Sequence, residues 1–277
     1  MVDFRPNFRI LRYWMMGNWQ NASLLEVLAL ASPRRLGGNN PQNQIDHIEE
    51  AGKHLVVWIK GVDRPLYYPK DIELHYLHMV INECTNPKSW HYYETAGTTV
   101  EHDDAVLDCG ASEGMFSLLA LRRCKRIFIA EPLPEFVDCL NLTFSGIQHV
   151  KVLPFALSKE DGEAFLEPAG ISSRIVSGKE GIKISTRSID SLFAENGEDI
   201  TYIKADLEGH EIDVLKGATR TIQRNTPKIS ITTYHEPDHA EWIAKFLTRI
   251  EPRYRIKKRG ICLERGNPVM LHAWIER

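Results

Sequence analysis

The feature that most constrains this chain is a regular alternation of apolar and amphipathic segments that begins near residue 101. The apolar segments have the length of buried strands, and the segments between them carry apolar residues at helical spacing, such as Val214, Ala218 and Ile222. Strands that alternate with helices form parallel βαβ units, so we expect an α/β fold with a doubly wound, Rossmann-like sheet. The expected strands are Ala105–Cys109, Arg126–Ala130, Val150–Pro154, Ile200–Ala205 and Lys228–Tyr234, and the expected helices are Ser112–Arg123, Pro134–Phe144, Ser188–Glu195, Glu208–Arg224 and Glu241–Ile250.

The end of the chain breaks this alternation. Tyr254–Lys258 and Val269–Ile275 are strand candidates, and the segment that joins them contains Gly260 and Gly266 but no helical pattern. Such a connection predicts a β-hairpin. The hairpin would add one antiparallel strand at the end of the sheet.

Residues 1 to about 100 show no such alternation, and we expect them to form an N-terminal accessory segment that caps the α/β domain of residues 101–277. The segment contains helix candidates at Leu24–Ala31 and Asp71–Cys84, a loop at Ser32–Gln44, and a β-hairpin formed by His54–Lys60 and Pro65–Tyr68.

Charge and cysteine content limit the class of protein. A net charge of −3 argues against a general nucleic-acid binder, which would carry a basic surface. The five cysteines form no CxxC pair and are expected to be reduced thiols of an intracellular protein. No segment is long and apolar enough to span a membrane, so we expect a cytoplasmic location. A homodimer formed through the N-terminal segment is compatible with these features.

The segment Val106–Gly114, with the sequence VLDCGASEG, places small residues directly after a buried strand. Gly110 and Gly114 leave room for a cofactor that presses its methionine and ribose against the backbone. Ser112 is the expected N-cap of the following helix, whose free N–H groups could meet the cofactor carboxylate. Asp108 could accept hydrogen bonds from the cofactor ammonium group. This pattern favours S-adenosylmethionine.

A second element strengthens the prediction. Glu131 follows the next strand, and an acidic residue there can accept both ribose hydroxyls. Ala156 and Leu157 follow the third strand and could line an adenine slot, although a plain strand end explains them equally well. The expected cofactor-binding residues are Asp108, Gly110, Ala111, Ser112, Gly114, Glu131, Pro132, Ala156 and Leu157.

A nicotinamide dinucleotide is the rival cofactor. Its fingerprint is GxGxxG, whereas the sequence from Gly110 is GASEG, so the second and third glycines of the fingerprint are missing. The pyrophosphate would then have no close approach to the backbone. By analogy with known folds, a terminal hairpin also separates methyltransferases from most nicotinamide dehydrogenases.

Polar side chains follow the fourth and fifth strands as well. Asp206 and His235 come at strand ends, at the sheet edge where open α/β sheets bind ligands. We expect them to act as an acid–base or metal-binding pair with Glu208 as a helper, and the sequence specifies no particular metal. A hydrogen-bonded histidine at a strand end is an equally good explanation of His235. For Glu211, in the first helical turn, we favour a purely helix-stabilising role.

The run His235–His239 formally matches the HExxH zinc motif. The histidines of that motif must share one helix face, whereas His235 ends a strand and Pro237 would break a helix. We therefore do not predict a zinc protease.

Several stretches resemble the FkbM family of methyltransferases, over roughly residues 100 to 235. They are LDCGASEGMFSLLA with AEPLPEF, VLPFALSKEDGEAFL, and STRSIDSL followed by YIKADLEGHEIDVLKGA. The resemblance implies a class I methyltransferase fold, S-adenosylmethionine as cofactor and O-methylation. Ser112 and Glu113 depart from the family, which commonly carries asparagine and an apolar residue there.

These features together predict an S-adenosylmethionine-dependent O-methyltransferase. Its expected partner is a small-molecule or glycan acceptor, with a hydroxyl on a sugar, a glycan or a polyketide-type natural product, and not a nucleic acid. Two alternatives remain at this point. One is an NAD(P)-dependent oxidoreductase on the same topology, and the other is a non-catalytic module that binds S-adenosylmethionine.

Overall fold

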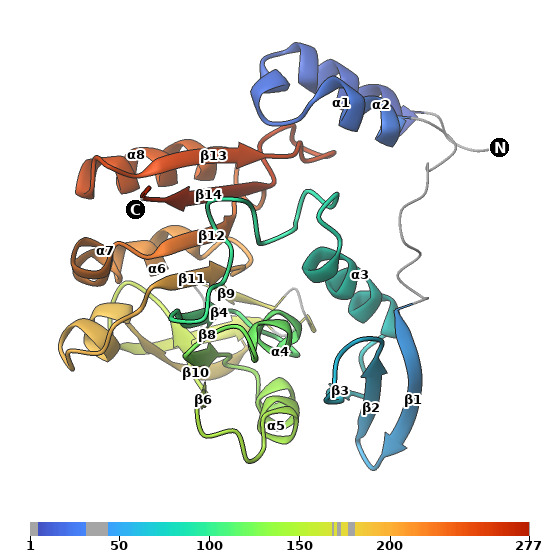
Figure 1. Ribbon diagram of the computed structural model, residues 1–277, viewed down its shortest axis with the longest axis vertical. Helices are drawn as coiled ribbons and strands as arrows, with labels where there is room; N and C mark the ends of the chain where they lie inside the picture. Colours follow the sequence, from blue (N-terminus) through green and yellow to red (C-terminus); the bar gives the residue numbers. More distant parts are fainter. Residues whose placement is uncertain (1–4, 32–43, 168, 171–172, 177–180, 277) are drawn as a thin grey trace.

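A seven-stranded sheet forms the centre of the protein in the computed structural model, which describes residues 5–31, 44–167, 169–170, 173–176 and 181–276 (Figure 1). Five strands are parallel, and β14 runs antiparallel to both β12 and β13. The mostly parallel sheet and its terminal hairpin are therefore confirmed. In sheet order the strands are β13 (Arg255–Arg259), β14 (Met270–Trp274), β12 (Lys228–Thr232), β11 (Tyr202–Ala205), β4 (Ala105–Cys109), β5 (Arg126–Ala130) and β6 (Val150–Leu153).

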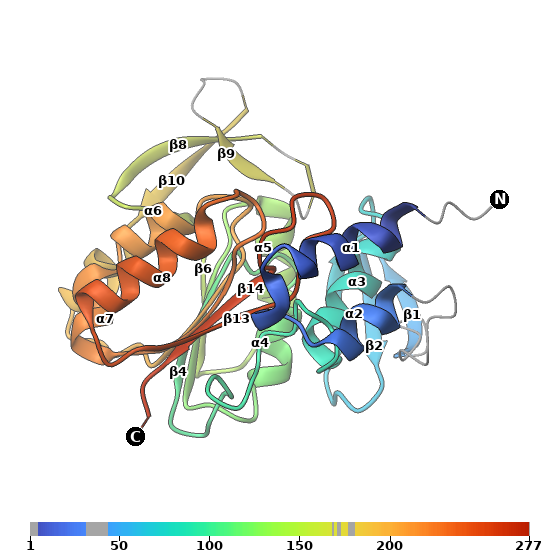
Figure 2. The ribbon, with the colours of Figure 1, turned by 90° about the horizontal axis from the view of Figure 1, so that it is seen from above.

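Helices cover both faces of this sheet (Figure 2). Alternate residues of β4 enter the two cores, with Val106 in one hydrophobic cluster and Leu107 in the other, as the two-residue period of a strand requires. The first cluster includes residues of α4 (Met115–Ala120) and α5 (Pro134–Thr143). The second includes residues of α6 (Glu211–Lys216), α7 (Thr219–Asn225) and α8 (His239–Ile250).

The single helix expected over Glu208–Arg224 is wrong, because α6 and α7 are separate helices. The chain breaks at Gly217, where a Cβ atom would lie 2.2 Å from the carbonyl oxygen of Ser158. The Asp190 carboxylate then accepts hydrogen bonds from the backbone N–H groups of Arg220 and Thr221, at the start of α7. Asp190 itself begins a short π-helical turn, Asp190–Ala194, within the segment expected to be helical.

The connection between β6 and β11 forms a second sheet that the sequence analysis missed. Most side chains of β8 and β10 are not buried, so these strands show only a weak alternation of apolar and polar residues in the sequence. This sheet extends beyond the end of the central sheet (Figure 2). Its strands, in sheet order, are β7 (Ala156–Leu157), β10 (Ile182–Arg187), β8 (Gly162–Glu167) and β9 (Arg174–Val176).

The N-terminal segment contains the expected β2–β3 hairpin and an additional strand, β1, that pairs with β2. Most of β1 is exposed, so it lacks the apolar alternation that identifies a strand in sequence. Most of the expected loop, residues 32–43, lies outside the described residues. The elements are α1 (Arg5–Met15), the 3-10 turn η1 (Asn18–Gln20), α2 (Leu24–Ala31), β1 (Ile45–Ala51), β2 (His54–Ile59), β3 (Leu66–Pro69) and α3 (Leu74–Thr85).

This segment shares its core with the α/β domain. Leu66 and Leu77 belong to the same buried cluster as Met115 and Phe136. A boundary near residue 100 stays a prediction. Within the described ranges, no helix has the length and apolar character needed to cross a bilayer.

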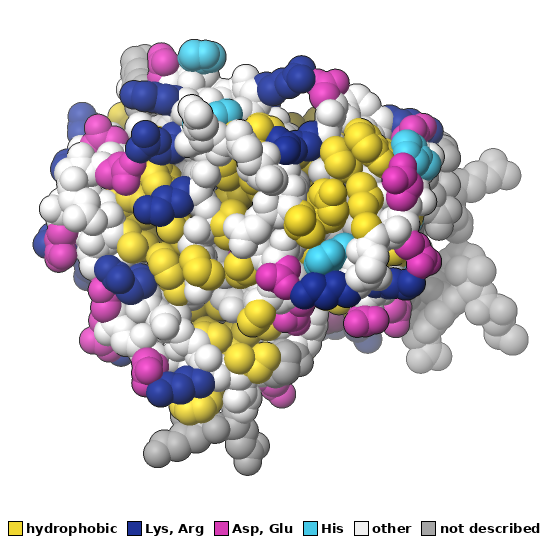
Figure 3. Space-filling model, turned by 90° about the horizontal axis from the view of Figure 1, so that it is seen from below, with side chains coloured by type: hydrophobic (Ala, Val, Ile, Leu, Met, Phe, Trp, Pro, Cys, Tyr) yellow, Lys and Arg dark blue, Asp and Glu magenta, His cyan; other side chains and the backbone are white. Residues whose placement is uncertain are grey.

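The surface seen from below mixes charges of both signs. Lysine and arginine side chains alternate there with aspartate and glutamate, and hydrophobic side chains lie in patches between them (Figure 3). The part of this face that the structure describes has no extended basic surface. The expected absence of a nucleic-acid partner stays a prediction.

A buried polar cluster attaches residues 93–98 to the sheet. Tyr202 donates its hydroxyl proton toward the carbonyl oxygens of Tyr93 and Thr98, each at 3.0 Å. His272 Nδ1 lies 2.9 Å from the hydroxyl of Thr98 and 3.2 Å from that of Ser230. His272 is fully buried, and burial lowers its pKa from 6.5 to about 3.

We expect His272 to make the fold sensitive to acid. Between pH 6.5 and about 3 the unfolded state binds one more proton at His272 than the folded state. The free energy of unfolding should therefore fall as the pH falls, by about 1.4 kcal/mol per pH unit in this window. Urea unfolding of His272→Gln at pH 7, 6, 5 and 4 should show a shallower slope. The exposed His102→Gln serves as control, and equal slopes for all three proteins would contradict this account.

Candidate active site

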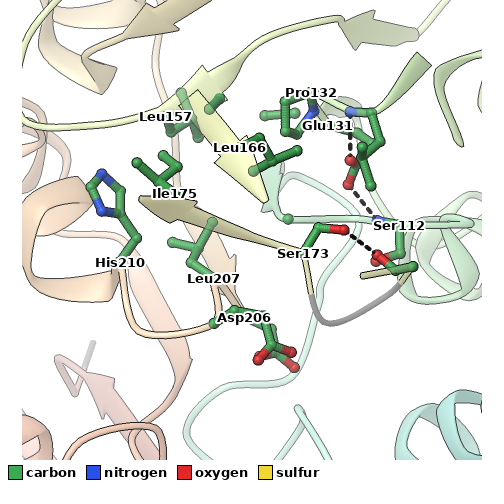
Figure 4. Close-up of a pocket in the computed structure, with 16 residues that line it drawn as sticks. Ser112, Glu131, Pro132, Leu157, Leu166, Ser173, Ile175, Asp206, Leu207 and His210 are labelled. Carbon is green, nitrogen blue, oxygen red and sulfur yellow. Dashed lines mark hydrogen bonds between the residues drawn. The ribbon is translucent and has the colours of Figure 1, made fainter. Parts of the chain in front are cut away.

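A pocket that is open to solvent lies at the carboxyl ends of β4, β5 and β11. Leu166 and Ile175, from the second sheet, form part of its wall (Figure 4). The expected cofactor residues that line it are Gly110, Ser112, Glu131, Pro132, Ala156 and Leu157.

Glu131 presents a buried carboxylate to this pocket. Its two oxygens accept hydrogen bonds from the backbone N–H groups of Ser112 and Leu133, each at 2.9 Å (Figure 4). Burial raises the pKa of Glu131 to about 7, although these two hydrogen bonds lower it. Each carboxylate oxygen has a second lone-pair direction, so Glu131 can still accept two hydroxyl groups from a ligand.

The loop between β4 and α4 differs in detail from the expectation. Ser112 is not the N-cap, because α4 begins at Met115 after Gly114, which has a φ of 85°. Ser112 itself has a φ of 48°, and its N–H group binds Glu131. The loop therefore makes a wider turn before the helix starts. Ala111 and Gly114 lie outside the pocket lining.

Asp108 also lies outside the lining, and its side chain is fully buried. Lys204 Nζ is 3.1 Å from Asp108 Oδ1 and donates a hydrogen bond to the carbonyl oxygen of Gly110 at 2.8 Å. Ser117 donates its hydroxyl proton to the other oxygen of Asp108. Asp108 thus binds the ammonium group of Lys204. Through Lys204, which also binds the Gly110 carbonyl, Asp108 stabilises the loop without lining the pocket.

Lys204 was missed by the sequence analysis, although a lysine within an apolar strand is a signal. Burial alone would lower the pKa of Lys204, but the carboxylates of Asp108 and Asp206 raise it above its usual value. Lys204 therefore stays charged between the loop and the end of β11.

Asp206, Glu208 and His235 are brought together as expected. His235 Nε2 lies 3.4 Å from Glu208 Oε2 and 3.8 Å from Asp206 Oδ1. Asp206 and Glu208 line the pocket, whereas His235 lies outside the lining. The donor atoms of Asp206, Glu211 and His235 lie within 4.8 Å of one another, a spacing compatible with a metal ion.

Glu211 is more than the helix-stabilising residue that we expected. It is fully buried, and its Oε1 atom accepts hydrogen bonds from the Leu207 N–H group, the Thr232 hydroxyl and His235 Nδ1. The sequence analysis explained Glu211 by its position at the helix start and missed this role, because Thr232 and His235 come from β12 and the loop after it.

The pKa values of His235 and Glu211 are shifted by the contacts that these residues make within the cluster. Burial lowers the pKa of His235, but Glu208 and Glu211 beside it outweigh that effect and raise it to about 10. Burial raises the pKa of Glu211, whereas His235 and His239 lower it well below its usual range. At neutral pH, His235 is therefore an imidazolium and not a proton acceptor.

Three further residues reach this edge from the N-terminal segment. Tyr93 donates its hydroxyl proton to Asp206 Oδ2 at 2.8 Å. His91 packs edge-on against Tyr234, with ring centroids 5.0 Å apart. Burial, with the charge of Asp206 nearby, raises the pKa of Glu83 to about 8. No sequence motif marks these residues, because only the tertiary fold brings them to the site.

His210 also lines the pocket without having been predicted. Its Nε2 atom is 3.0 Å from the Ser158 hydroxyl, and burial lowers its pKa. His210 and Leu207 face Glu131 and Pro132 across the pocket (Figure 4).

Comparison with known proteins gives a family match. The chain matches the methyltransferase FkbM domain over residues 108–256. It is also similar to the hexuronic acid methyltransferase AglP of Haloferax volcanii, with 32% identity over 129 residues. That match covers 44% of this chain and 53% of the relative, so the chain spans about half the length of this curated relative.

A solved structure shows the same fold. The crystal structure of methyltransferase FkbM from Methylobacillus flagellatus KT has a TM-score of 0.52 and 17% identity to this chain. The superposition covers 96% of this chain and 59% of that one. The class I methyltransferase fold is therefore confirmed.

We expect Gly110→Ala to disrupt the loop. A Cβ atom at Gly110 would lie 2.1 Å from the carbonyl oxygen of Asp206, and its φ is +70°. Gly146 is a matched control, because its φ is +76° and a Cβ atom there would contact nothing within 4 Å. Gly146→Ala should lower the free energy of unfolding by about 1–2 kcal/mol, and Gly110→Ala by about 3 kcal/mol or more. Equal losses in chemical denaturation would show that the contact with Asp206 is unimportant.

Proposed function

This chain belongs to the FkbM family of methyltransferases, and on that premise we propose that it transfers a methyl group from S-adenosylmethionine to a sugar hydroxyl. One observation carries the proposal. Glu131 and the Gly110–Ser112 loop form one side of a pocket whose other side ends at the carboxylates of Asp206 and Glu208. A nucleoside cofactor and a hydroxyl acceptor could therefore meet in a single pocket.

The residues present fit the cofactor. Glu131 would accept hydrogen bonds from the ribose hydroxyls, and the Gly110–Ser112 backbone would contact the methionine part. The carbonyl of Asp206 lies so close to Gly110 that only glycine fits there. The adenine ring would lie between apolar walls from Pro132, Leu157 and Leu207, all of which line the pocket.

The bound cofactor would supply an electrophilic methyl group. The task of this chain is then to align the acceptor oxygen with the bond that breaks, and to assist loss of its proton. Asp206 suits that task because it lines the pocket and accepts a hydrogen bond from Tyr93, which fixes its carboxylate. In this proposal Asp206 accepts the hydroxyl proton as the oxygen attacks.

His235 and Glu208 have different roles from Asp206. A pKa of about 10 keeps His235 protonated, so it does not serve as the base that the sequence allowed. Its position behind Asp206 and Glu208 makes it a positioning residue whose positive charge keeps both carboxylates in place. Glu208, which lines the pocket, remains the helper that contacts the acceptor.

The acceptor class follows from the relative. The relative is named as a hexuronic acid methyltransferase, so a uronic acid or a glycan that contains one is the acceptor that we propose for this chain. Family membership removes the support for the oxidoreductase alternative, and no feature of the described residues favours a non-catalytic module. The cytoplasmic location and the homodimer stay predictions.

We expect Asp206→Asn to abolish most of the activity while S-adenosylmethionine still binds. Loss of a positioned proton acceptor should lower kcat about 100-fold or more. The assay measures transfer of a labelled methyl group from S-adenosylmethionine to a panel of uronic acids and neutral sugars. The control is Asp238→Asn, an exposed residue in the loop that also carries His235. Full turnover by Asp206→Asn would exclude Asp206 as the base, and no transfer by the wild-type protein would contradict the proposed function.

A further inference from the structure

We propose that His235, Asp206 and Glu208 bind a divalent cation at the edge of the pocket, with Glu211 as the carboxylate that orients the imidazole. The binding site rests on geometry alone. Its role in catalysis rests on the proposed function.

The orientation of His235 leaves one ring nitrogen for a ligand. Nδ1 lies 2.8 Å from Glu211 Oε1, which the Leu207 N–H group and the Thr232 hydroxyl hold in place. A histidine that binds a metal commonly donates its other N–H group to a carboxylate in this way. The imidazole is therefore fixed with Nε2 directed toward Glu208 and Asp206. A cation bound there would replace the proton that Nε2 carries in the cation-free protein.

Nε2 is buried without a partner. The His235 side chain is 9% exposed, and Nε2 makes no hydrogen bond to any residue that the structure describes. A buried polar atom without a partner is costly, so this position calls for a ligand. Nε2 is 3.4 Å from Glu208 Oε2 and 3.8 Å from Asp206 Oδ1. Donors at adjacent positions around a cation, each about 2.1 Å from it, are about 3 Å apart. Asp206 and His235 belong to the group whose donor atoms lie within 4.8 Å of one another, and the Glu208 side chain would move to join them when a cation binds.

The surrounding charge also favours a cation. Three carboxylates, those of Asp206, Glu208 and Glu211, lie within 4 Å of one imidazole. The buried ammonium of Lys204 is already bound to Asp108 and to the Gly110 carbonyl. Once Nε2 has lost its proton, His235 is neutral, and a divalent cation would balance negative charge of the three carboxylates.

The donor set indicates which cation. One imidazole nitrogen with two carboxylate oxygens suits Mn²⁺, which accepts oxygen ligands together with histidine. Because Asp206 and Glu208 line the pocket, the cation would have open positions toward the acceptor. There it would act as a Lewis acid that lowers the pKa of the acceptor hydroxyl. It would also offset the repulsion between an acidic sugar and the acidic cluster.

The test is a titration of the full chain with Mn²⁺ alone. Electron paramagnetic resonance monitors binding, because the signal of the free ion is lost when Mn²⁺ binds to the protein. We expect one site per chain. His235→Gln and Asp206→Asn should weaken binding about tenfold or more, and so should Glu211→Gln through the imidazole. The exposed Asp238→Asn should bind as the wild type does.

A second measurement covers variants that fold poorly. Mn²⁺ should raise the unfolding temperature of the wild type but not that of His235→Gln. No Mn²⁺ binding by the wild type, or equal binding by all variants, would overturn the proposal. Because this titration contains neither S-adenosylmethionine nor acceptor, its failure is distinguishable from failure of the proposed function. If the protein binds no Mn²⁺ and its methyl transfer is unchanged in excess chelator, the proposed function still holds and the cation site is excluded.

Discussion

The buried ion pair between Lys204 and Asp108 is the interaction on which the rest of the site depends. The two residues are direct partners in the pairing of β11 with β4, and their charged atoms are 3.1 Å apart. The same ammonium group binds the carbonyl oxygen of Gly110. The Lys204 ammonium group thus connects the loop that carries Gly110 to β11, the strand that leads to Asp206. Loss of one partner from such a pair leaves a buried charge uncompensated, at a cost of about 3–5 kcal/mol.

The two segments that this ion pair joins form the two sides of the pocket. The loop after β4 turns back so that Ser112 binds Glu131, which sets the cofactor side. The end of β11 places Asp206 where Tyr93 can hold it, which sets the acceptor side. Tyr93 comes from the N-terminal segment, and the second sheet covers the pocket. Both additions to the central sheet therefore contribute to the site and not only to the fold.

Much of this arrangement could be predicted from the sequence, because parallel strands and their loops leave local signals. Gly110, Glu131 and Asp206 each follow an apolar strand, so their meeting at one sheet edge follows from topology. Lys204 could not be placed, because its partner Asp108 had an adequate explanation as a ligand contact. Likewise, Glu211 was explained locally by the helix start. Tyr93 lies outside any motif, and its contact with Asp206 spans more than 100 residues of chain.

The central claim is that this pocket holds S-adenosylmethionine by its ribose at Glu131. Calorimetric titration with S-adenosylmethionine at pH 8.5, where a carboxyl group with a pKa of about 7 is ionised, tests it most directly. We expect the wild type to bind and Glu131→Gln to bind about 10- to 100-fold more weakly, because hydrogen bonds to a charged acceptor are lost. The exposed Glu135→Gln should bind as the wild type does. Equal affinity of Glu131→Gln and the wild type, or no binding by the wild type, would contradict it.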